Sequence, residues 1–524
     1  MIAALLLIVV IFALGIANLD NNCNWGDDFA AYMADGIAMA EGSYEEQTRL
    51  NVILRSGKLV GVQDTHVHAW GFPAIHAITY SLFGFDRAAF SNLYVYKLPS
   101  LIALTLMSVI CYLFFRRRLG FGISFLMSLA LCSHMEFYDA IRNLYNDLFF
   151  MALSVSCFYF AEVYLEETKG SAKYLDALIL GILIWFSYSV RLNGVVTALC
   201  ILLAQIIYLL KNKSRPKFLD LLPVLIFGLL FVVFNKLIFP WPTSTSSASD
   251  VNMALLFSGI SYYLDQLLTW SKHFANICLD IPVSFATTVF YSLVDSPELC
   301  SAVSRIAAFI LNEVCTFLGA ALLVLSVVGM LSFGIKKDTH IVVFILISFF
   351  GTSALGLRQE LRYLYVILPY ILMFAVLGVN KILKFFQRKN TGPQCTKNKL
   401  LSGIVTAVLC IFAVLPALEC GIENVTNYTQ ENLTAYSSHA IEVYNYIDEN
   451  LGEDEQIAFF KPRALYLNTG RVSILPHEGG LPITNADYYL EYKPAEEPWL
   501  TDELKAQYTA VFENAEFILH RKIA

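Results

Sequence analysis

The chain contains a series of long apolar runs, which constrain its fold more than any other feature. A helix that crosses a lipid bilayer needs about 20 mainly apolar residues, because only internal hydrogen bonds satisfy its backbone there. Such runs lie near 1–19, 93–115, 120–135, 146–165, 175–191, 193–210, 219–239, 305–334, 339–357, 362–380 and 400–418. The sequence therefore predicts an all-α polytopic membrane protein with about eleven transmembrane helices.

The composition agrees with a large lipid-facing surface. Charged residues make up 15% of the 524 residues and hydrophobic residues 57%, whereas soluble domains carry about 25% charged residues. The net charge of −7 is mild and argues against nucleic acid as a partner. Most of the eleven cysteines lie inside apolar runs without zinc-site spacing, so we interpret them as small apolar packing residues.

Lysine and arginine are distributed unequally between the loops, which predicts the orientation. One set of short loops holds seventeen of them, including Arg116–Arg118, Lys336 and Lys337, and the opposite set holds four. The richer side is predicted to be cytoplasmic. The N-terminus then lies in the cytoplasm, with the first run retained as an anchor. The C-terminal segment lies on the extracytoplasmic side, and the cell membrane is the expected location.

Three extracytoplasmic segments are large, namely 20–92, 240–304 and the tail 419–524. The first two contain short amphipathic stretches, Phe29–Ala40 and Tyr262–Phe274, which predict helices along the membrane surface. We therefore divide the chain into a transmembrane module, 1–418, and a small extracytoplasmic α/β domain, 419–524. In that domain we expect a helix at Ser438–Leu451, a helix start at Pro462–Leu467, and strands at Gln456–Phe460, Ala486–Tyr492 and Glu516–His520.

Two adjacent carboxylates, Asp27 and Asp28, follow the first apolar run. Neighbouring acids repel each other, which disfavours the simultaneous ionisation of both. A carboxylate of this kind can act as a general base towards a hydroxyl group. The alternative interpretation is a pair of solvated acids that mark the outer end of a membrane helix.

Four arginines, Arg142, Arg191, Arg358 and Arg362, are predicted to lie at the outer ends of membrane spans. Charged groups near the membrane core cost about 2.5–3.5 kcal/mol each on insertion scales, so they tend to mark functional sites. Arginine binds phosphate oxygens with two parallel hydrogen bonds. The alternatives are that these side chains reach the interface or pair with nearby acids such as Glu360.

Several weak motifs occur in a fixed order along the chain. They comprise Asn24–Phe29, the helix ending at Glu41-Gly42, His66–Pro73, Tyr80–Phe85, Tyr96–Ser100, Tyr138–Asn143, Asn146-Asp147, Ser187–Gly194, Arg358–Tyr363 and Lys461–Arg471. In this order they resemble the GT-C superfamily of membrane glycosyltransferases, which includes protein O-mannosyltransferases and aminoarabinose transferases. In that superfamily the acidic pair is usually Asp-Glu, so Asp28 departs from the pattern and leaves open which carboxylate is the base.

The resemblance implies a transfer reaction at the extracytoplasmic face. A sugar would move from a polyprenyl-phosphate donor to an acceptor hydroxyl, with inversion at the anomeric carbon. Asp27 or Asp28 would accept the hydroxyl proton. The donor phosphate would be bound by Arg191, Arg362, Arg358 and Arg142, and the substrate cavity would include Tyr32, His68, Asp139, Asp147, Glu360 and Tyr363. The Trp-Trp-Asp signature of oligosaccharyltransferases is absent, which favours a monosaccharide donor.

His66 and His68 could contribute to a divalent-metal site near Asp64, since a few relatives bind a metal near this loop, but packing at a wet interface is the alternative. Asn424, Asn427 and Asn432 each begin an N-glycosylation sequon.

Two other functions remain open at this stage. A transporter or flippase for a lipid-linked glycan would be built from repeats with broken helices near the midplane. No internal repeat is evident here, and the polar residues are predicted to gather at the outer ends. A non-catalytic membrane scaffold is the third possibility. The acceptor class (protein, lipid or cell-wall glycan) is not indicated by the sequence.

Overall fold

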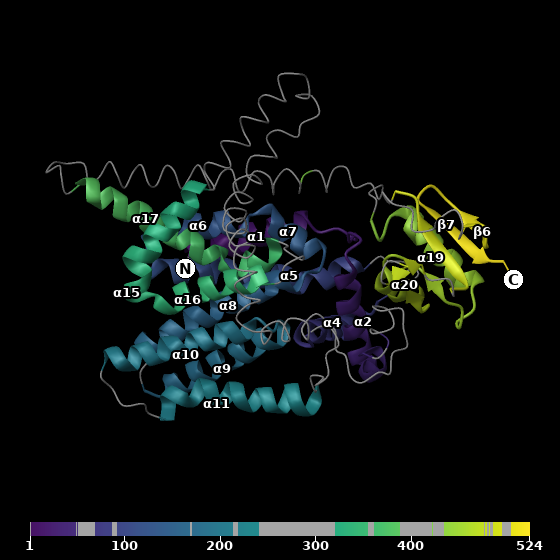
Figure 1. Cartoon of the computed structure of the whole chain (residues 1–524). Coiled ribbons are helices and arrows are strands. Elements are labelled where there is room, and N and C mark those ends of the chain that lie inside the picture. The colour runs from purple at the N-terminus through teal and green to yellow at the C-terminus, as the bar shows by residue number, and fades with distance from the viewer. Residues whose placement is uncertain are drawn as a thin grey trace, which may run out of the picture.

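The computed structural model describes residues 2–48, 50, 69–85, 92–167, 170–212, 218–239, 320–354, 361–387, 422, 434–475, 477–478, 481–482, 486–494 and 505–523. These residues form a bundle of helices and, at one end of it, a domain with a β-sheet (Figure 1). Two helices of the first large loop, α2 (Asp27–Glu41) and α4 (Gly71–Phe83), lie between the two parts (Figure 1).

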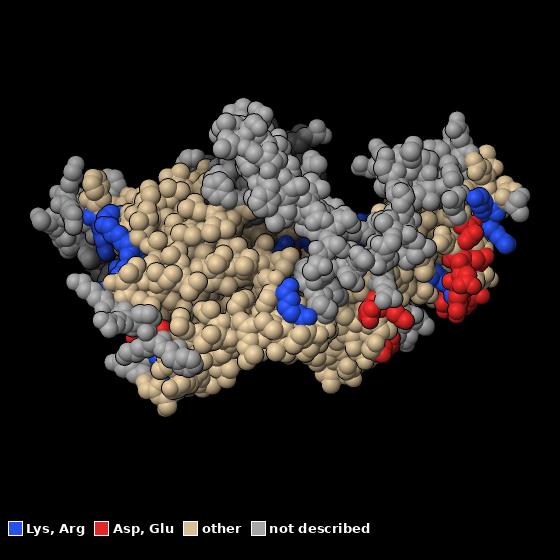
Figure 2. Space-filling view, turned by 60° about the horizontal axis from the view of Figure 1, so that its bottom comes forward, with Lys and Arg blue, Asp and Glu red and all other residues tan. Residues whose placement is uncertain are grey.

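Among the described residues, seven helices are long and apolar enough to cross a membrane. They span Leu93–Arg116 (α5), Asn146–Glu166 (α8 with η1), Ala172–Val190 (α9), Gly194–Lys211 (α10), Leu219–Ile238 (α11 with η2), Ala320–Lys337 (which ends in η4 and α15) and Arg362–Phe385 (η5 with α17). The bounds of the paired elements are Asn146–Glu162 (α8) and Val163–Glu167 (η1), Phe218–Val232 (α11) and Val233–Ile238 (η2), Met330–Gly334 (η4) and Ile335–Lys337 (α15), and Leu361–Ile367 (η5) and Leu368–Gln387 (α17). The chain is therefore an integral, multi-pass membrane protein. In the face shown in Figure 2, few charged side chains cover the helical bundle, whereas Asp and Glu gather over the C-terminal domain.

The predicted number of about eleven spans is not confirmed. The helices α1 (Ile2–Ala17) and Thr339–Phe349 within α16 (Thr339–Ala354) lie where spans were predicted, but they are shorter than the others. A 16-residue helix is about 24 Å long, which is less than the hydrocarbon core of a bilayer. The predicted span 305–334 lies partly outside the described residues, and 400–418 lies wholly outside them. The predicted helix Tyr262–Phe274 and the asparagines of the three sequons also lie outside them.

The predicted short span 120–135 is a bent pair of helices. The helix α6 (Phe121–Cys132) is followed by α7 (Met135–Arg142) after a bend of 42°, and the pair is an eighth candidate span. The apolar pattern ends at α6, because α7 carries Glu136, Asp139 and Arg142. The bend thus places a polar helix at the end of the bundle that faces α2.

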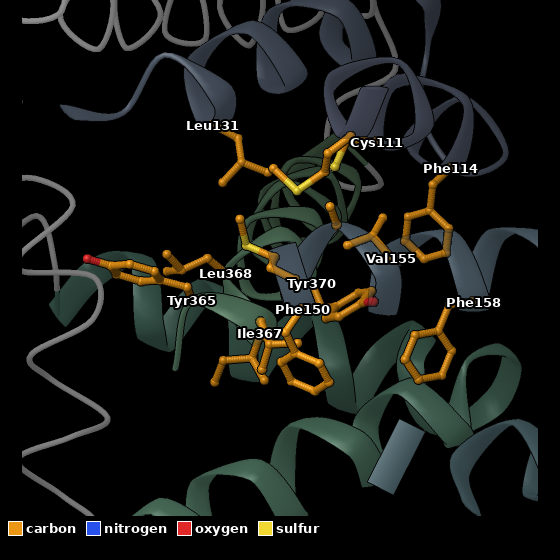
Figure 3. Packing of buried hydrophobic residues seen from close by; sticks show 14 of the residues in the cluster. Cys111, Phe114, Leu131, Phe150, Val155, Phe158, Tyr365, Ile367, Leu368 and Tyr370 are labelled. Carbon is orange, nitrogen blue, oxygen red and sulfur yellow. The ribbon is translucent and has the colours of Figure 1, made fainter. Parts of the chain in front are cut away.

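The core of the bundle is packed from apolar and aromatic side chains of α5, α6, α8, α16, η5 and α17. Figure 3 shows Phe114, Phe158 and Tyr370 close together, and the ring centroids of Phe158 and Tyr370 lie 5.5 Å apart. Cys111, Cys132, Cys157 and Cys200 are buried and free, as expected for small apolar packing residues. Lipid tails are as apolar as leucine, so helix association depends on this close packing.

Two glycines allow two spans to cross at close range. A Cβ atom added at Gly378 of α17 (Leu368–Gln387) would lie 2.0 Å from the carbonyl oxygen of Leu325, and one added at Gly329 would lie 1.9 Å from that of Phe374. The Ser326 hydroxyl donates to the carbonyl oxygen of Ile371 at 2.8 Å beside this crossing. Small residues are enriched where helices cross in membrane bundles, because they let the backbones approach closely.

The loops rich in lysine and arginine meet at the end of the bundle opposite to α2. Arg118 forms ion pairs with Glu162 and with Asp338, to which it lies at 2.6 Å. The Lys211 ammonium donates to the carbonyl oxygen of Lys336 at 3.2 Å. The structure thus gathers these loops at one end, as predicted, while the side of the membrane that they face stays a prediction.

The C-terminal domain contains a five-stranded sheet in the order β2-β1-β5-β7-β6. The strands are β1 (Ile457–Ala458), β2 (Ser473–Ile474), β5 (Tyr488–Tyr492), β6 (Tyr508–Glu513) and β7 (Phe517–Lys522), and β3 (His477–Glu478) pairs with β4 (Leu481–Pro482) separately. The strands β2, β1 and β5 are parallel, and β7 is antiparallel to β5 and β6. The helices α19 (Ser438–Asn450) and α20 (Pro462–Thr469) complete the domain.

The predicted elements of this domain are confirmed, and the short strands β2, β3 and β4 and the strand β6 are additional to the prediction. Ser437 caps α19 by accepting from the amide of Ala440, and Pro462 begins α20, so local signals define both helices. The strand β6 lies at the edge of the sheet and most of its residues are exposed. Its sequence therefore lacks a clear alternation of buried apolar and exposed polar residues, which is the signal that predicts a strand. The boundary at 418/419 lies outside the described residues and remains a prediction.

We expect Gly378→Ala to destabilise the bundle, because the added methyl group would lie 2.0 Å from a backbone oxygen. The matched control is Gly228→Ala in α11 (Phe218–Val232), where a Cβ meets nothing within 4 Å. At that open position alanine improves helix propensity by up to about 1 kcal/mol. Thermal unfolding in one detergent compares the two, and equal Tm values would contradict the close crossing.

Candidate functional site

The candidate site lies where four segments meet at the end of the bundle that carries the C-terminal domain. The helix α2 begins at Asp27, α8 (Asn146–Glu162) begins at Asn146, α9 ends at Val190, and η5 (Leu361–Ile367) begins next to Arg362. Asp147 lies in the first turn of α8, where the helix dipole favours a negative charge. Arg191 follows α9 in an extended conformation, which directs it away from the helix axis.

Asp147 is the centre of the ion-pair network. Its carboxylate is only 4% exposed and is paired with Arg191, and Nε of Arg362 lies 4.0 Å from its Oδ2. Arg191 also donates from Nη1 to Oδ1 of Asn146 at 3.3 Å. The Asn146 amide in turn donates to the carbonyl oxygen of Val190 at 3.2 Å. The start of α8 and the end of α9 are thereby joined by polar contacts.

Arg362 connects this network to the first large loop. Its Nη2 donates to Oδ2 of Asp28 at 3.0 Å. The guanidinium lies over the ring of Tyr145 at 4.1 Å and over that of Tyr363 at 5.4 Å, and Arg191 lies 4.9 Å from the same Tyr363 ring. Cation–π contacts add to the ion pairs in holding both guanidinium groups. The structure thus brings together Asp28, Asp147, Arg191, Arg362 and Tyr363, while their predicted roles in catalysis and binding stay predictions.

Tyr32 lies one helical turn beyond Asp28 in α2 and is buried. Burial raises the pKa of its phenol, and the charge of Asp28 adds to this, although Arg191 and Arg362 act in the opposite direction. The phenol therefore stays protonated at neutral pH. It can donate a hydrogen bond in the site but cannot act as a base there.

Arg142 and Asp139 form a neighbouring group on α7. Arg142 donates from Nε to the carbonyl oxygen of Asn18 at 2.9 Å, and it lies 3.4 Å from Asp139 and 3.8 Å from Asp20. These contacts hold the end of α1 and the start of the first large loop. The predicted role of Arg142 and Asp139 in donor binding stays a prediction.

Lys97 holds the start of the first large loop, a contact that the sequence did not predict. Its side chain is fully buried in α5, and its ammonium group donates to Oδ1 of Asp20 at 2.6 Å, to the carbonyl oxygen of Asp20 at 2.9 Å and to that of Asn22. It therefore fixes the chain that precedes the acidic pair. A lysine inside an apolar helix was the available signal, since such charges need a partner.

Several predicted site residues lie outside the described residues. These are His66, His68, Arg358, Glu360 and the side chain of Asp27. His76, the third histidine of the loop, is described, and its ring centroid lies 4.7 Å from that of Phe72. Burial lowers its pKa to about 3, so it stays neutral. Its position fits the interpretation as a packing residue.

Among the described residues, no group of three or more His, Cys, Asp or Glu could hold a metal ion. The predicted metal ligands His66 and His68 lie outside the described residues, so the divalent metal stays a prediction and no step is assigned to one.

No family model matches the sequence, and no curated protein is similar to it in sequence. Solved structures are similar in fold. An oligosaccharyltransferase from Archaeoglobus fulgidus, crystallised with Zn and sulfate, has a TM-score of 0.54 and 11% identity over 94% of this chain and 68% of its own. The same enzyme tethered to an acceptor peptide with an NVT sequon has a TM-score of 0.52 and 12% identity, and the match covers 93% of this chain and 69% of the enzyme.

The match to ArnT from Cupriavidus metallidurans, bound to undecaprenyl phosphate, covers 98% of the ArnT chain and 99% of this chain, with a TM-score of 0.46 and 12% identity. At identities this low, similarity to solved structures concerns the fold. The oligosaccharyltransferase structures show that this chain shares their fold, which agrees with the predicted GT-C fold.

We expect Arg191→Ala to destabilise the protein, because it leaves the buried Asp147 carboxylate without its closest partner. Breaking a buried ion pair costs about 3–5 kcal/mol. The double variant Arg191→Ala/Asp147→Asn removes the unpaired charge and should recover part of this loss. Thermal unfolding of both single variants and the double variant measures the coupling, and strictly additive effects would contradict a direct pair.

Proposed function

We propose that this chain, which has the GT-C fold, transfers a sugar from a polyprenyl-phosphate donor to an acceptor hydroxyl at the extracytoplasmic face. The observation that carries the proposal is the contact between Asp28 and Arg362, which are 334 positions apart, within a cluster that also holds Arg191. An acid from the first loop and cations from two distant spans thus share one site. A transfer reaction with an anionic leaving group needs this combination.

The two arginines supply the site for the donor phosphate in this proposal. Arg191 and Arg362 lie at the end of the bundle, so a lipid tail can remain in the membrane while its phosphate reaches them. Guanidinium groups bind phosphate oxygens bidentately and stabilise the negative charge that develops on a leaving phosphate. Asp147 holds both arginines in place before the donor binds.

The acidic pair supplies the proton acceptor. Asp28 is bound to Arg362, so we assign it the role of orienting that arginine and Asp27 the role of the base. The acceptor hydroxyl gives its proton to the carboxylate, and its oxygen forms a bond to the anomeric carbon. The bond between that carbon and the phosphate oxygen breaks, and polyprenyl phosphate leaves. A single displacement of this kind inverts the anomeric configuration.

The donor is proposed to carry a hexose or pentose, because the Trp-Trp-Asp signature of oligosaccharyltransferases is absent from the chain. The similarity to the Archaeoglobus fulgidus oligosaccharyltransferase concerns the fold and does not alter this point. A lipid-linked glycan transporter is the second candidate. It would move its substrate across the bilayer and leave the sugar–phosphate bond intact, so release of polyprenyl phosphate in vitro separates the two.

Asp27→Asn and Asp28→Asn should each abolish most of the transfer. Loss of a general base costs about 10²–10⁴-fold in rate. The measurement is glycan analysis of a deletion strain that carries each variant, together with the release of polyprenyl phosphate by the purified proteins. Full restoration of the missing glycan by Asp27→Asn would remove this residue from the catalytic role and leave Asp28 as the candidate.

Arg191→Lys and Arg362→Lys should weaken use of the donor while preserving the charge that the fold needs. Lysine is a point charge and lacks the planar fork of arginine, so we expect kcat/KM for the donor to fall by about 10²-fold. Arg116→Ala, at the opposite end of the bundle, is the control that should behave as the unmodified protein. Unchanged donor kinetics in both lysine variants would place the phosphate elsewhere.

A further inference from the structure

Trp25 lies two residues before the acidic pair, and its indole ring packs into the C-terminal domain. Four aromatic rings of that domain surround it, with centroid distances of 5.4–5.9 Å. They belong to Phe459, Phe460, Tyr492 and Phe517, and are called the Trp25 socket below. The socket is formed by the end of β5, the start of β7 and the residues between β1 and α20.

The chain on either side of Trp25 is attached to the same domain. The Thr434 hydroxyl donates to Oδ1 of Asn22 at 2.6 Å, and the amide of Ala435 donates to the carbonyl oxygen of Cys23 at 3.1 Å. After the acidic pair, Phe29 and Tyr436 bring their ring centroids within 6.0 Å. Figure 1 shows α20 beside α2 accordingly. The domain thus contacts the segment 22–29 before, at and after the indole.

The opposite side of the segment contacts the membrane bundle. The amide of Asn24 donates to Oδ1 of Asn143 at 2.9 Å, and its side-chain amide donates to the Tyr145 hydroxyl at 3.3 Å. The Asn24 side-chain oxygen accepts from the amide of Gly26 at 2.9 Å. Tyr145 is the residue whose ring lies under the Arg362 guanidinium. A continuous path of contacts therefore leads from the Trp25 socket to the site.

We propose that the C-terminal domain is a positioning part of the active site, and that Trp25 is the positioning residue through which it acts. The domain supplies a rigid aromatic socket, and the indole fixes where α2 begins and therefore where its two carboxylates point. This inference rests on the proposed transferase function, because it assigns to those carboxylates the role described above.

The location of the socket accounts for the specific effect expected. Trp25 contacts neither Arg191 nor Asp147 in any interaction described above, so the Arg191 part of the phosphate site should be retained when the indole is lost. The carboxylates would instead be misplaced relative to the acceptor hydroxyl. A misplacement of about 1 Å can lower the rate by about 10²-fold. Because Asp28 also orients Arg362, we expect a fall in kcat that clearly exceeds the accompanying rise in the KM for the donor.

The experiment uses the full-length protein in lipid nanodiscs and compares Trp25→Ala, Trp25→Phe and a matched control. The control is Phe512→Ala, which removes an aromatic contact of the same domain with Tyr446, at a centroid distance of 4.6 Å, away from the first loop. Release of polyprenyl phosphate gives kcat and KM. Amide hydrogen exchange of peptides covering residues 22–32 measures how well ordered this segment is, independently of activity.

We expect Trp25→Ala to lower kcat by about 10²-fold and to raise exchange in 22–32 by about tenfold or more. Trp25→Phe, which keeps an aromatic ring in the socket, should recover most of both effects, and Phe512→Ala should show neither. Equal losses in Trp25→Ala and Phe512→Ala would overturn the proposal, since the domain would then contribute general stability. A rise in donor KM as large as the fall in kcat would overturn it as well.

The exchange measurement separates this inference from the proposed function. If the unmodified protein cleaves no polyprenyl-phosphate sugar, the transferase function fails, whatever the behaviour of Trp25. If it does cleave such a donor but Trp25→Ala leaves exchange in 22–32 unchanged, the positioning role fails and the transferase function stands.

Discussion

The structure depends on one buried carboxylate, that of Asp147, which holds two arginines from distant spans. Arg191 comes from the end of α9 and Arg362 from the start of η5, and each brings its helix to the start of α8. Ion pairs in a poorly hydrated setting hold their geometry because either partner alone would leave a buried charge. This constraint joins three spans at the end of the bundle where the first loop arrives.

The first large loop is held from two sides at that end. Lys97 fixes residues 20–22 to the bundle, and the C-terminal domain packs around Trp25. Asp28 then completes the network by binding Arg362. Each of these contacts is made by a part of the chain that is remote in sequence, so the position of the acidic pair is a consequence of the whole fold.

Polar networks lie at both ends of the bundle, and apolar packing lies between them. Arg118 with Glu162 and Asp338 forms the network at the end opposite to α2. Between the two networks, close contact at Gly329 and Gly378 and a core of aromatic side chains hold the spans. Charges are costly in the hydrocarbon region, which restricts ion pairs to the ends of the spans and leaves packing to hold the middle.

The sequence by itself determined the membrane class, the gathering of the basic loops at one end and most elements of the C-terminal domain, because hydropathy, charge and capping are local signals. Its order of motifs also indicated the fold. Only the tertiary structure decided that Asp147 pairs with Arg191, that Lys97 holds the first loop and that Trp25 enters the C-terminal domain. Such partners are selected by packing between helices, for which a single sequence carries no periodic pattern.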